Sequence, residues 1–177
     1  ENEVYFIKKY ERRKRMININ DLIDENLIFL DLDLKTKSEV LETMADILYK
    51  EGKLINSKDE KVKDGFIKAL WDREEAFSTA VGFSFGIPHG KCEFVKDACI
   101  SYARLKNEIE WAEDEKVKYI FMIGVSAEQA GNQHLEILIK LSTSILDDGF
   151  RKKLKEAENK KETLEIIKEY ASKERTS

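Results

Sequence analysis

The feature that most limits the fold is the apolar run Tyr119 to Val125, which lies within residues 118–125. Side chains of a β-strand alternate between its two faces, so this segment would be apolar on both. A strand of that kind is typical of the centre of a sheet that is covered on both sides. We therefore expect residues 118–125 to form a central strand with helices packed above and below. The run is also far too short to span a bilayer.

Other segments alternate between strand and helix patterns. Strands are predicted over 27–32 and 97–104, with strand and turn over 78–88. A first helix is predicted over 36–51 and ends at Gly52, and a second begins at a capping box formed by Ser57 and Glu60. A third helix is predicted over 131–147, and a last one begins at Asn159 and Glu162. This alternation predicts an α/β domain in which layers of helix cover a sheet.

The 177 residues suit one domain, and the apolar fraction of 42% is enough for a core. Residues 1–16 differ from the rest, because a basic stretch over 8–15 follows apolar residues 4–7. We expect a basic N-terminal extension or the remnant of an upstream segment there, and a folded body over 17–172. A net charge of −4 argues against nucleic acid as a direct partner. Without a signal peptide or a membrane-spanning segment, we expect a cytoplasmic protein with no membrane insertion.

Histidine is scarce, with His89 and His134 as the two candidates for imidazole chemistry. His89 lies in Gly86-Ile87-Pro88-His89-Gly90. The proline restricts the backbone before His89, and the glycine permits a tight turn or a close approach by another part of the chain. A rigid, accessible histidine at the end of a strand would suit a nucleophile that meets a partner protein. On spacing alone, a surface turn that happens to contain histidine fits as well.

His134 and Arg73 are the second and third candidate site residues. His134 lies about one turn into the helix flagged by Gly131 and Asn132, where free N–H groups and the helix dipole favour a neutral ring that can donate to a phosphoryl oxygen. A core-facing histidine bonded to a backbone carbonyl is the alternative. Arg73 ends a helix sixteen residues before His89, and its guanidinium matches phosphate oxygens. A helix-terminal arginine favoured only by the dipole is the alternative there.

A metal site and two other catalytic designs are less well supported. His89, Cys92 and His134 could be drawn together around zinc, but further cysteine or histidine ligands are missing. Cys92 and Cys99 have neither zinc nor redox spacing, and we expect them to be buried thiols. Gly82-Phe83-Ser84-Phe85-Gly86 has the Gly-x-Ser-x-Gly spacing, but a nucleophile elbow lies between a strand and a helix, and no helix is predicted directly after residue 86. A phosphate-binding glycine loop is missing from the sequence. We therefore expect no metal, no cofactor and no direct use of ATP.

Three motifs, in order, carry a resemblance that covers about Ile17 to Tyr170. They are Trp71-Asp72-Arg73-Glu74-Glu75 followed by Ser78-Thr79, then Gly86-Ile87-Pro88-His89-Gly90, and Asn132-Gln133-His134-Leu135 with Leu138 and Leu141. Together they resemble the fructose–mannitol family (type 2) of enzyme IIA domains of the bacterial phosphoenolpyruvate-dependent sugar phosphotransferase system. Each motif alone is weak, but their joint order and spacing are specific.

The resemblance implies a phosphoryl carrier. His89 would be the phosphorylated residue, and His134 and Arg73 would contact the phosphoryl group. The donor would be the histidine carrier protein HPr, and the acceptor a cysteine of an enzyme IIB domain, during fructose- or mannitol-type uptake. The implied fold is a three-layer αβα sandwich with a central mixed sheet of about five strands. Fusion to other phosphotransferase or regulator domains also occurs in the family.

The stretch before Ile87 departs from the family pattern, because Ala80 and Ser84 stand where glycines are common and Gly86 replaces an alanine. This leaves the choice of partner and sugar open, with Phe83, Phe85 and Ile87 as candidates for an apolar docking surface. A regulatory domain, nitrogen-linked or fused to a transcription regulator, is the main alternative function. A small metallohydrolase or metal-binding domain and an interaction module with a vestigial site are the others.

Overall fold

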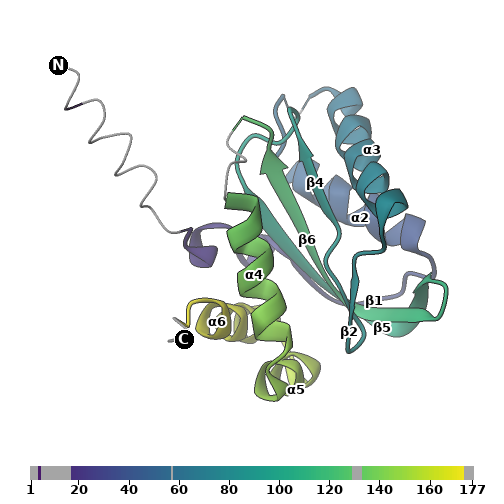
Figure 1. Cartoon of the computed structure of the whole chain (residues 1–177), viewed down its shortest axis with the longest axis vertical. Coiled ribbons are helices and arrows are strands. Elements are labelled where there is room, and N and C mark those ends of the chain that lie inside the picture. Colours follow the sequence, from purple (N-terminus) through teal and green to yellow (C-terminus); the bar gives the residue numbers. More distant parts are fainter. Residues whose placement is uncertain (1–3, 5–16, 57, 129–132, 174–177) are drawn as a thin grey trace.

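The computed structural model describes residues 4, 17–56, 58–128 and 133–173 (Figure 1). The predicted extension over 1–16 therefore lies outside the described residues, apart from Val4. In the described part, no helix is both long and apolar enough to cross a membrane.

The sheet is mixed and has six strands in the described part of the chain, one more than the expected number. They are β1 (Ile28–Leu32), β2 (Ala80–Gly82), β3 (Phe85–Gly86), β4 (His89–Cys92), β5 (Cys99–Ala112) and β6 (Glu115–Ser126). The order is β1-β5-β6-β3-β2, and β4 also pairs with β6. The β5–β6 and β2–β3 pairs are antiparallel, whereas β1–β5, β3–β6 and β4–β6 are parallel. As predicted, the apolar segment over 118–125 is central.

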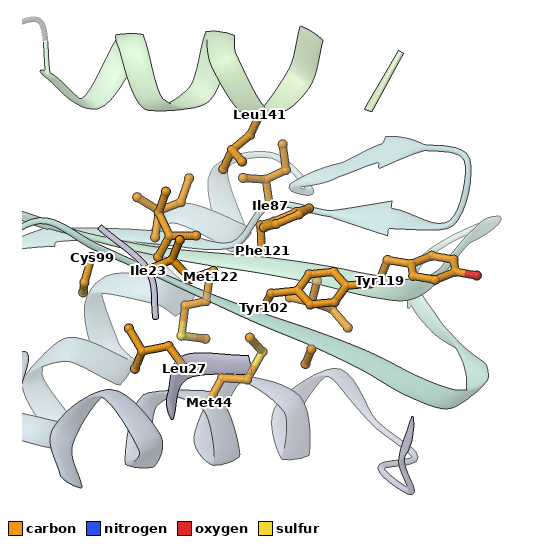
Figure 2. Packing of buried hydrophobic residues seen from close by; sticks show 14 of the residues in the cluster. Ile23, Leu27, Met44, Ile87, Cys99, Tyr102, Tyr119, Phe121, Met122 and Leu141 are labelled. Carbon is orange, nitrogen blue, oxygen red and sulfur yellow. The ribbon is translucent and has the colours of Figure 1, made fainter. Parts of the chain in front are cut away.

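Helices cover both faces of this sheet, which confirms the predicted three-layer αβα fold (Figure 1). One layer holds α2 (Lys37–Lys50) and α3 (Glu60–Ala76). The other holds α4 (Gln133–Ile145), α5 (Asp148–Glu156) and α6 (Lys160–Ala171). Figure 2 shows Leu141 of α4 pointing to Phe121 from one side of the sheet, while Met44 of α2 lies on the other. All three side chains are fully buried.

Helix α3 begins later than its predicted capping box. The N-cap is Asp59, whose carboxylate accepts the Lys61 N–H at 3.0 Å. The prediction of Ser57 as the N-cap is therefore wrong, and Ser57 itself lies outside the described residues. An aspartate directly before the first helical residue satisfies the free N–H groups of the first turn equally well. The predicted start of α6 is confirmed, because Asn159 caps it by accepting the Glu162 N–H at 2.8 Å.

Strand β5 and helix α5 differ most from expectation. β5 continues to Ala112, well past the predicted end at residue 104, and forms a long hairpin with β6. Its residues 106–108 are exposed and lie in an irregularity of the β5–β6 register, so the apolar alternation that marks a strand stops there, and pairing with β6 resumes at Ile109. Helix α5 was not predicted. It buries only Phe150 and Leu154 on an otherwise polar segment, which is too little periodicity to recognise.

Candidate functional site

His89 begins a strand rather than ending one. Strands β3 and β4 pair with β6 in one register, since Gly86 lies opposite Ile120 and His89 opposite Ile123. The interruption between them contains Pro88, which has no N–H to donate but whose carbonyl accepts the Ile123 N–H at 3.0 Å. His89 is buried, with 7% of its surface exposed, so it is less accessible than the sequence suggested.

The glycine after His89 serves close packing, not a turn. Gly90 lies within β4, on the opposite face from the His89 side chain. A Cβ atom at this position would lie 2.8 Å from the ring of Phe66 on α3, closer than real Cβ contacts allow. The expected close approach is therefore confirmed, whereas the expected tight turn is wrong. This packing holds α3, and with it Arg73, against the strand that carries His89.

Arg73 contacts the His89 ring directly. It lies in the last turn of α3, and its Nε donates to Nε2 of His89 at 3.1 Å. One terminal nitrogen, Nη1, donates to the carbonyl of Phe77 at 2.6 Å, which fixes the guanidinium in place. Arginine is always charged, so this contact sets a permanent cation beside one ring nitrogen of His89.

The partners of His89 define which ring nitrogen carries the proton. Nδ1 lies 2.8 Å from the carbonyl of Ile87, and a carbonyl can only accept, so Nδ1 carries the hydrogen. Nε2 faces an arginine N–H, which can only donate, so Nε2 holds a lone pair. The two contacts are satisfied together only by the neutral Nδ1–H tautomer. Nε2 is therefore the ring nitrogen whose lone pair could act as a nucleophile.

Electrostatics also favour the neutral ring. Burial lowers the pKa of His89 below its usual 6.5, and the charges of His134 and Arg73 lower it further. The hydrogen bond to Ile87 acts in the opposite direction, as does Glu74. An uncharged imidazole near neutral pH is what nucleophilic attack requires.

His134 packs against His89 from the other helical layer. It is the second residue of α4, closer to the helix start than predicted, while the flagging residues Gly131 and Asn132 lie outside the described residues. The two ring centroids are 4.9 Å apart, with the planes tilted by 53°. Within the described structure, Nε2 of His134 is buried without a hydrogen-bond partner. Burial lowers the pKa of His134, and the charges of Lys91 and Arg73 lower it further.

Lys91 is a neighbour that sequence reasoning missed. It lies two residues after His89 on β4, so the two side chains lie on the same face of the sheet. Lys91 is exposed, and its charge is the main electrostatic cause of the lowered pKa of His134. The two-residue alternation of a strand would have revealed it, had residues 89–92 been recognised as one. The site thus combines two neutral imidazoles with two cations, a set that suits a phosphoryl dianion.

The predicted docking residues are only partly exposed. Phe83 is exposed, but Phe85 and Ile87 are buried at 1% and 2% and are ruled out as a docking surface. Phe85 instead stacks on Tyr119 of β6. Phe77, beside Arg73, and Leu135, beside His134, are exposed apolar residues that the sequence did not single out.

Only one of the two cysteines is the buried thiol that was expected. Cys92 is half-buried, and burial raises its pKa, while Cys99 is fully buried with its pKa raised to about 12. Across the described residues, no three His, Cys, Asp or Glu side chains gather in a way that could hold a metal ion.

Similar proteins fall in one family. Multiphosphoryl transfer protein 2 of Escherichia coli K12 is 36% identical over 133 residues, which are 75% of this chain but 15% of that protein. The PTS system fructose-specific EIIA component of Haloferax volcanii is 32% identical over 154 residues, which are 86% of this chain and 96% of that protein. The chain thus spans a small part of one relative and nearly all of the other.

Solved structures give the same result for the fold. The crystal structure of nitrogen regulatory protein IIA-Ntr from Neisseria meningitidis has a TM-score of 0.74 at 26% identity, over 84% of this chain and 98% of that one. The complex of enzyme IIAMTL with phosphorylated enzyme IIBMTL from Escherichia coli has a TM-score of 0.68 at 20% identity, over 82% of this chain and 96% of that one. The family model of the phosphoenolpyruvate-dependent sugar phosphotransferase system, EIIA 2, matches residues 21–170, so the chain belongs to this family of phosphoryl-carrying phosphotransferase domains.

Proposed function

We propose that the chain accepts a phosphoryl group on Nε2 of His89 from phosphorylated HPr and passes it to a cysteine of an enzyme IIB domain. The observation that carries the proposal is the pair of hydrogen bonds on the His89 ring. Nδ1 is held by the carbonyl of Ile87, and Nε2 keeps its lone pair beside Arg73. The nucleophile is thus neutral and oriented before any donor arrives.

The transfer step is an exchange of one P–N bond for another. The lone pair of His89 Nε2 attacks the phosphorus, and the bond from phosphorus to the donor's histidine nitrogen breaks, leaving its electron pair on that nitrogen. The Nδ1 proton stays on His89, where the Ile87 carbonyl stabilises the positive charge that develops on the ring. The second transfer repeats this displacement with a cysteine thiolate as the attacking group.

Arg73 and His134 would hold the phosphoryl oxygens. Once Nε2 is bonded to phosphorus, the Arg73 N–H that now contacts it has an oxygen acceptor one bond further out. Nε2 of His134, which is buried without a partner in the described structure, would gain one if it carries a proton. Phosphoryl transfer depends mainly on such positioning and charge stabilisation.

Donor and acceptor proteins would dock around the mouth of the site. Phe77 and Leu135 are apolar and exposed, at 79% and 58%, and they flank the site next to Arg73 and His134. Exposed apolar residues beside a buried nucleophile suit a partner that must exclude water while the phosphoryl group moves. The complex formed by a similar mannitol enzyme IIA with phosphorylated enzyme IIB supports this choice of acceptor.

Fructose is the sugar class that the relatives favour, since one relative of similar length is a fructose-specific EIIA component.

We also propose 17–172 as the bounds of the carrier domain and the cytoplasm as its location. Ile17 is fastened to α4 by Glu136 and Lys140, at 3.2 and 2.8 Å, and Ser172 bonds to Asn20 at 3.0 Å. Both ends of the proposed domain are therefore tied to its body.

Reconstitution tests the proposal. The chain is incubated with phosphoenolpyruvate, enzyme I and HPr, and acid-labile phosphate on His89 is sought by intact mass and peptide mapping. We expect one phosphoryl group per chain, no labelling of His89→Gln, and slower labelling of His134→Ala. Full labelling of His89→Gln would refute the role of His89. NMR of His89 would show phosphorylation at Nε2.

A regulatory role is the second candidate, and the likeness to nitrogen regulatory protein IIA-Ntr favours it. The two roles differ after His89 is phosphorylated. A transport domain should pass the label to the cysteine of a fructose-type enzyme IIB within seconds to minutes. Retention of the label in the presence of that domain would favour the regulatory role.

A further inference from the structure

Glu74 is a buried carboxylate that the transfer mechanism does not use. It follows Arg73 in the last turn of α3, and its side chain is 1% exposed. Its oxygens accept the backbone N–H of Thr79 at 3.2 Å and, in a short contact, the Thr79 hydroxyl. A buried carboxylate is costly unless it is paired, so these contacts need a compensating cation.

Lys37 supplies that cation from a different helix. Its Nζ lies 2.8 Å from Glu74, and the Lys37 side chain is itself largely buried. Nζ also lies 5.7 and 5.1 Å from the ring centroids of Trp71 and Trp111. Because Lys37 is the first residue of α2, the helix dipole disfavours a cation there. The carboxylate of Glu74 and the two indole rings offset that cost.

A chain of hydrogen bonds connects this ion pair to the His89 ring. Glu74 binds the Thr79 N–H and hydroxyl, and the Thr79 carbonyl accepts the Ile87 N–H at 2.9 Å. The Ile87 carbonyl in turn accepts from Nδ1 of His89 at 2.8 Å. Arg73 adds a second connection to the same ring, since it contacts both His89 and the carbonyl of Phe77, which lies in the segment between α3 and β2.

We propose that Glu74 is a positioning residue that fixes the Nδ1–H tautomer of His89 through Thr79 and Ile87, with Lys37 as its counterion. This inference rests on the proposed role of His89 as nucleophile. A ring that is free to change tautomer would spend part of its time with the hydrogen on Nε2, where no lone pair is available for attack. By anchoring Thr79, Glu74 holds the Ile87 peptide in the orientation that excludes this state.

The direct test is the tautomer of His89, which needs no donor protein. The chain is labelled with ¹⁵N in histidine, and the two ring nitrogens are assigned by their shifts above the pKa of His89. Wild type should show protonation at Nδ1 alone. Glu74→Gln should show a mixture of tautomers, and its phosphorylation by phospho-HPr should slow by roughly 10- to 100-fold. Glu75→Gln, at the exposed neighbouring position, should match wild type in both measurements.

A second pair of variants covers the case in which Glu74→Gln unfolds because Lys37 is left unpaired. Thr79→Val keeps the shape of the side chain and the Glu74–Lys37 pair but removes the hydroxyl contact, whereas Thr79→Ser keeps that contact. Thr79→Val should give the tautomer mixture, and Thr79→Ser should restore the single tautomer and the wild-type rate.

The two proposals fail in different ways. A single Nδ1–H tautomer in folded Glu74→Gln or Thr79→Val would overturn the positioning role of Glu74, whatever the phosphorylation rates. If wild type itself took no phosphoryl group from phospho-HPr, the carrier function would fail, while the tautomer comparison would still decide whether Glu74 controls the ring.

Discussion

Nε of Arg73 donates a hydrogen bond to Nε2 of His89 across 3.1 Å, although the two residues lie in a helix and a strand separated by sixteen positions. The contact occupies the lone pair that would attack phosphorus. In the proposed mechanism, this contact orients His89 before the reaction, and the same donor would be available for a phosphoryl oxygen afterwards. Arg73 would then contact the ring before transfer and the phosphoryl group after it.

The first prediction concerns Arg73→Lys. Lysine keeps the charge but has no donor at the position of Nε, and a charge-assisted hydrogen bond contributes about 1.5–3 kcal/mol. We expect phosphorylation from phospho-HPr to slow by roughly 10- to 100-fold in single-turnover measurements. Arg151→Lys, on α5, is the matched control and should transfer at the wild-type rate. A wild-type rate for Arg73→Lys would mean that charge alone is sufficient.

The second prediction concerns pH. Burial lowers the pKa values of His89 and His134 below 6.5 in the folded state. Between those lowered values and 6.5, the unfolded chain binds more protons, so stability rises with pH in this window. The contribution is fully present above 6.5 and is lost as pH falls through the folded-state pKa values. The rate of phosphoryl acceptance should fall in the same direction, because only the neutral ring attacks.

Thermal melts at a series of pH values check the stability part. In a His89→Gln/His134→Gln double variant, the slope of Tm against pH just below 6.5 should be flatter than in wild type, because glutamine does not titrate. Carboxylates with lowered pKa values, such as Asp31 beside Arg104, act at lower pH and remain in both proteins. Identical slopes would contradict a lowered pKa for the two rings.

Some parts of the site can be predicted from motifs in the sequence, whereas others arise only when separate helices pack together. That His89, His134 and Arg73 lie together could be predicted, because the motifs that carry them resemble one family of domains in order and spacing. Lys37 could not, because its pairing with Glu74 arises only when α2 packs beside α3, and on its own it resembles a surface lysine at the start of a helix. Buried ion pairs of this kind leave no periodic pattern in the sequence.

The fold likewise has elements that local patterns predict and elements that depend on pairing between strands. The central strand and the helical layers follow from apolar periodicity, and the structure confirms them. The extension of β5 past residue 104 could not be predicted, because residues 106–108 are exposed and break the apolar alternation before the strand resumes with the pairing of Ile109 and Val117. Pairing between strands is what local pattern reasoning misses.

The third prediction concerns Gly90→Ala. The added Cβ would lie 2.8 Å from the Phe66 ring, so α3 must move away from β4 or the ring must shift. We expect a loss of about 1–3 kcal/mol in the free energy of unfolding, measured by chemical denaturation. Adding Phe66→Leu should make room, so the double variant should be more stable than the sum of the two single effects predicts. Strict additivity would show that Phe66 is not the obstacle.

The last prediction concerns Lys91, whose exposed ammonium lies on the same face of β4 as His89. Its charge should attract the phosphorylated donor, and surface charges of this kind contribute up to about 1 kcal/mol. Lys91→Gln should therefore slow transfer from phospho-HPr by roughly two- to fivefold at low ionic strength, and the difference should shrink as salt is added. The pKa of His134, followed by NMR, should rise, because the charge of Lys91 that helps to lower it is gone.

Lys96 is another exposed lysine nearby in sequence, and Lys96→Gln should change neither the transfer rate nor the pKa of His134. If Lys91→Gln behaved like Lys96→Gln, the positive charge beside the two imidazoles would have to come from Arg73 alone.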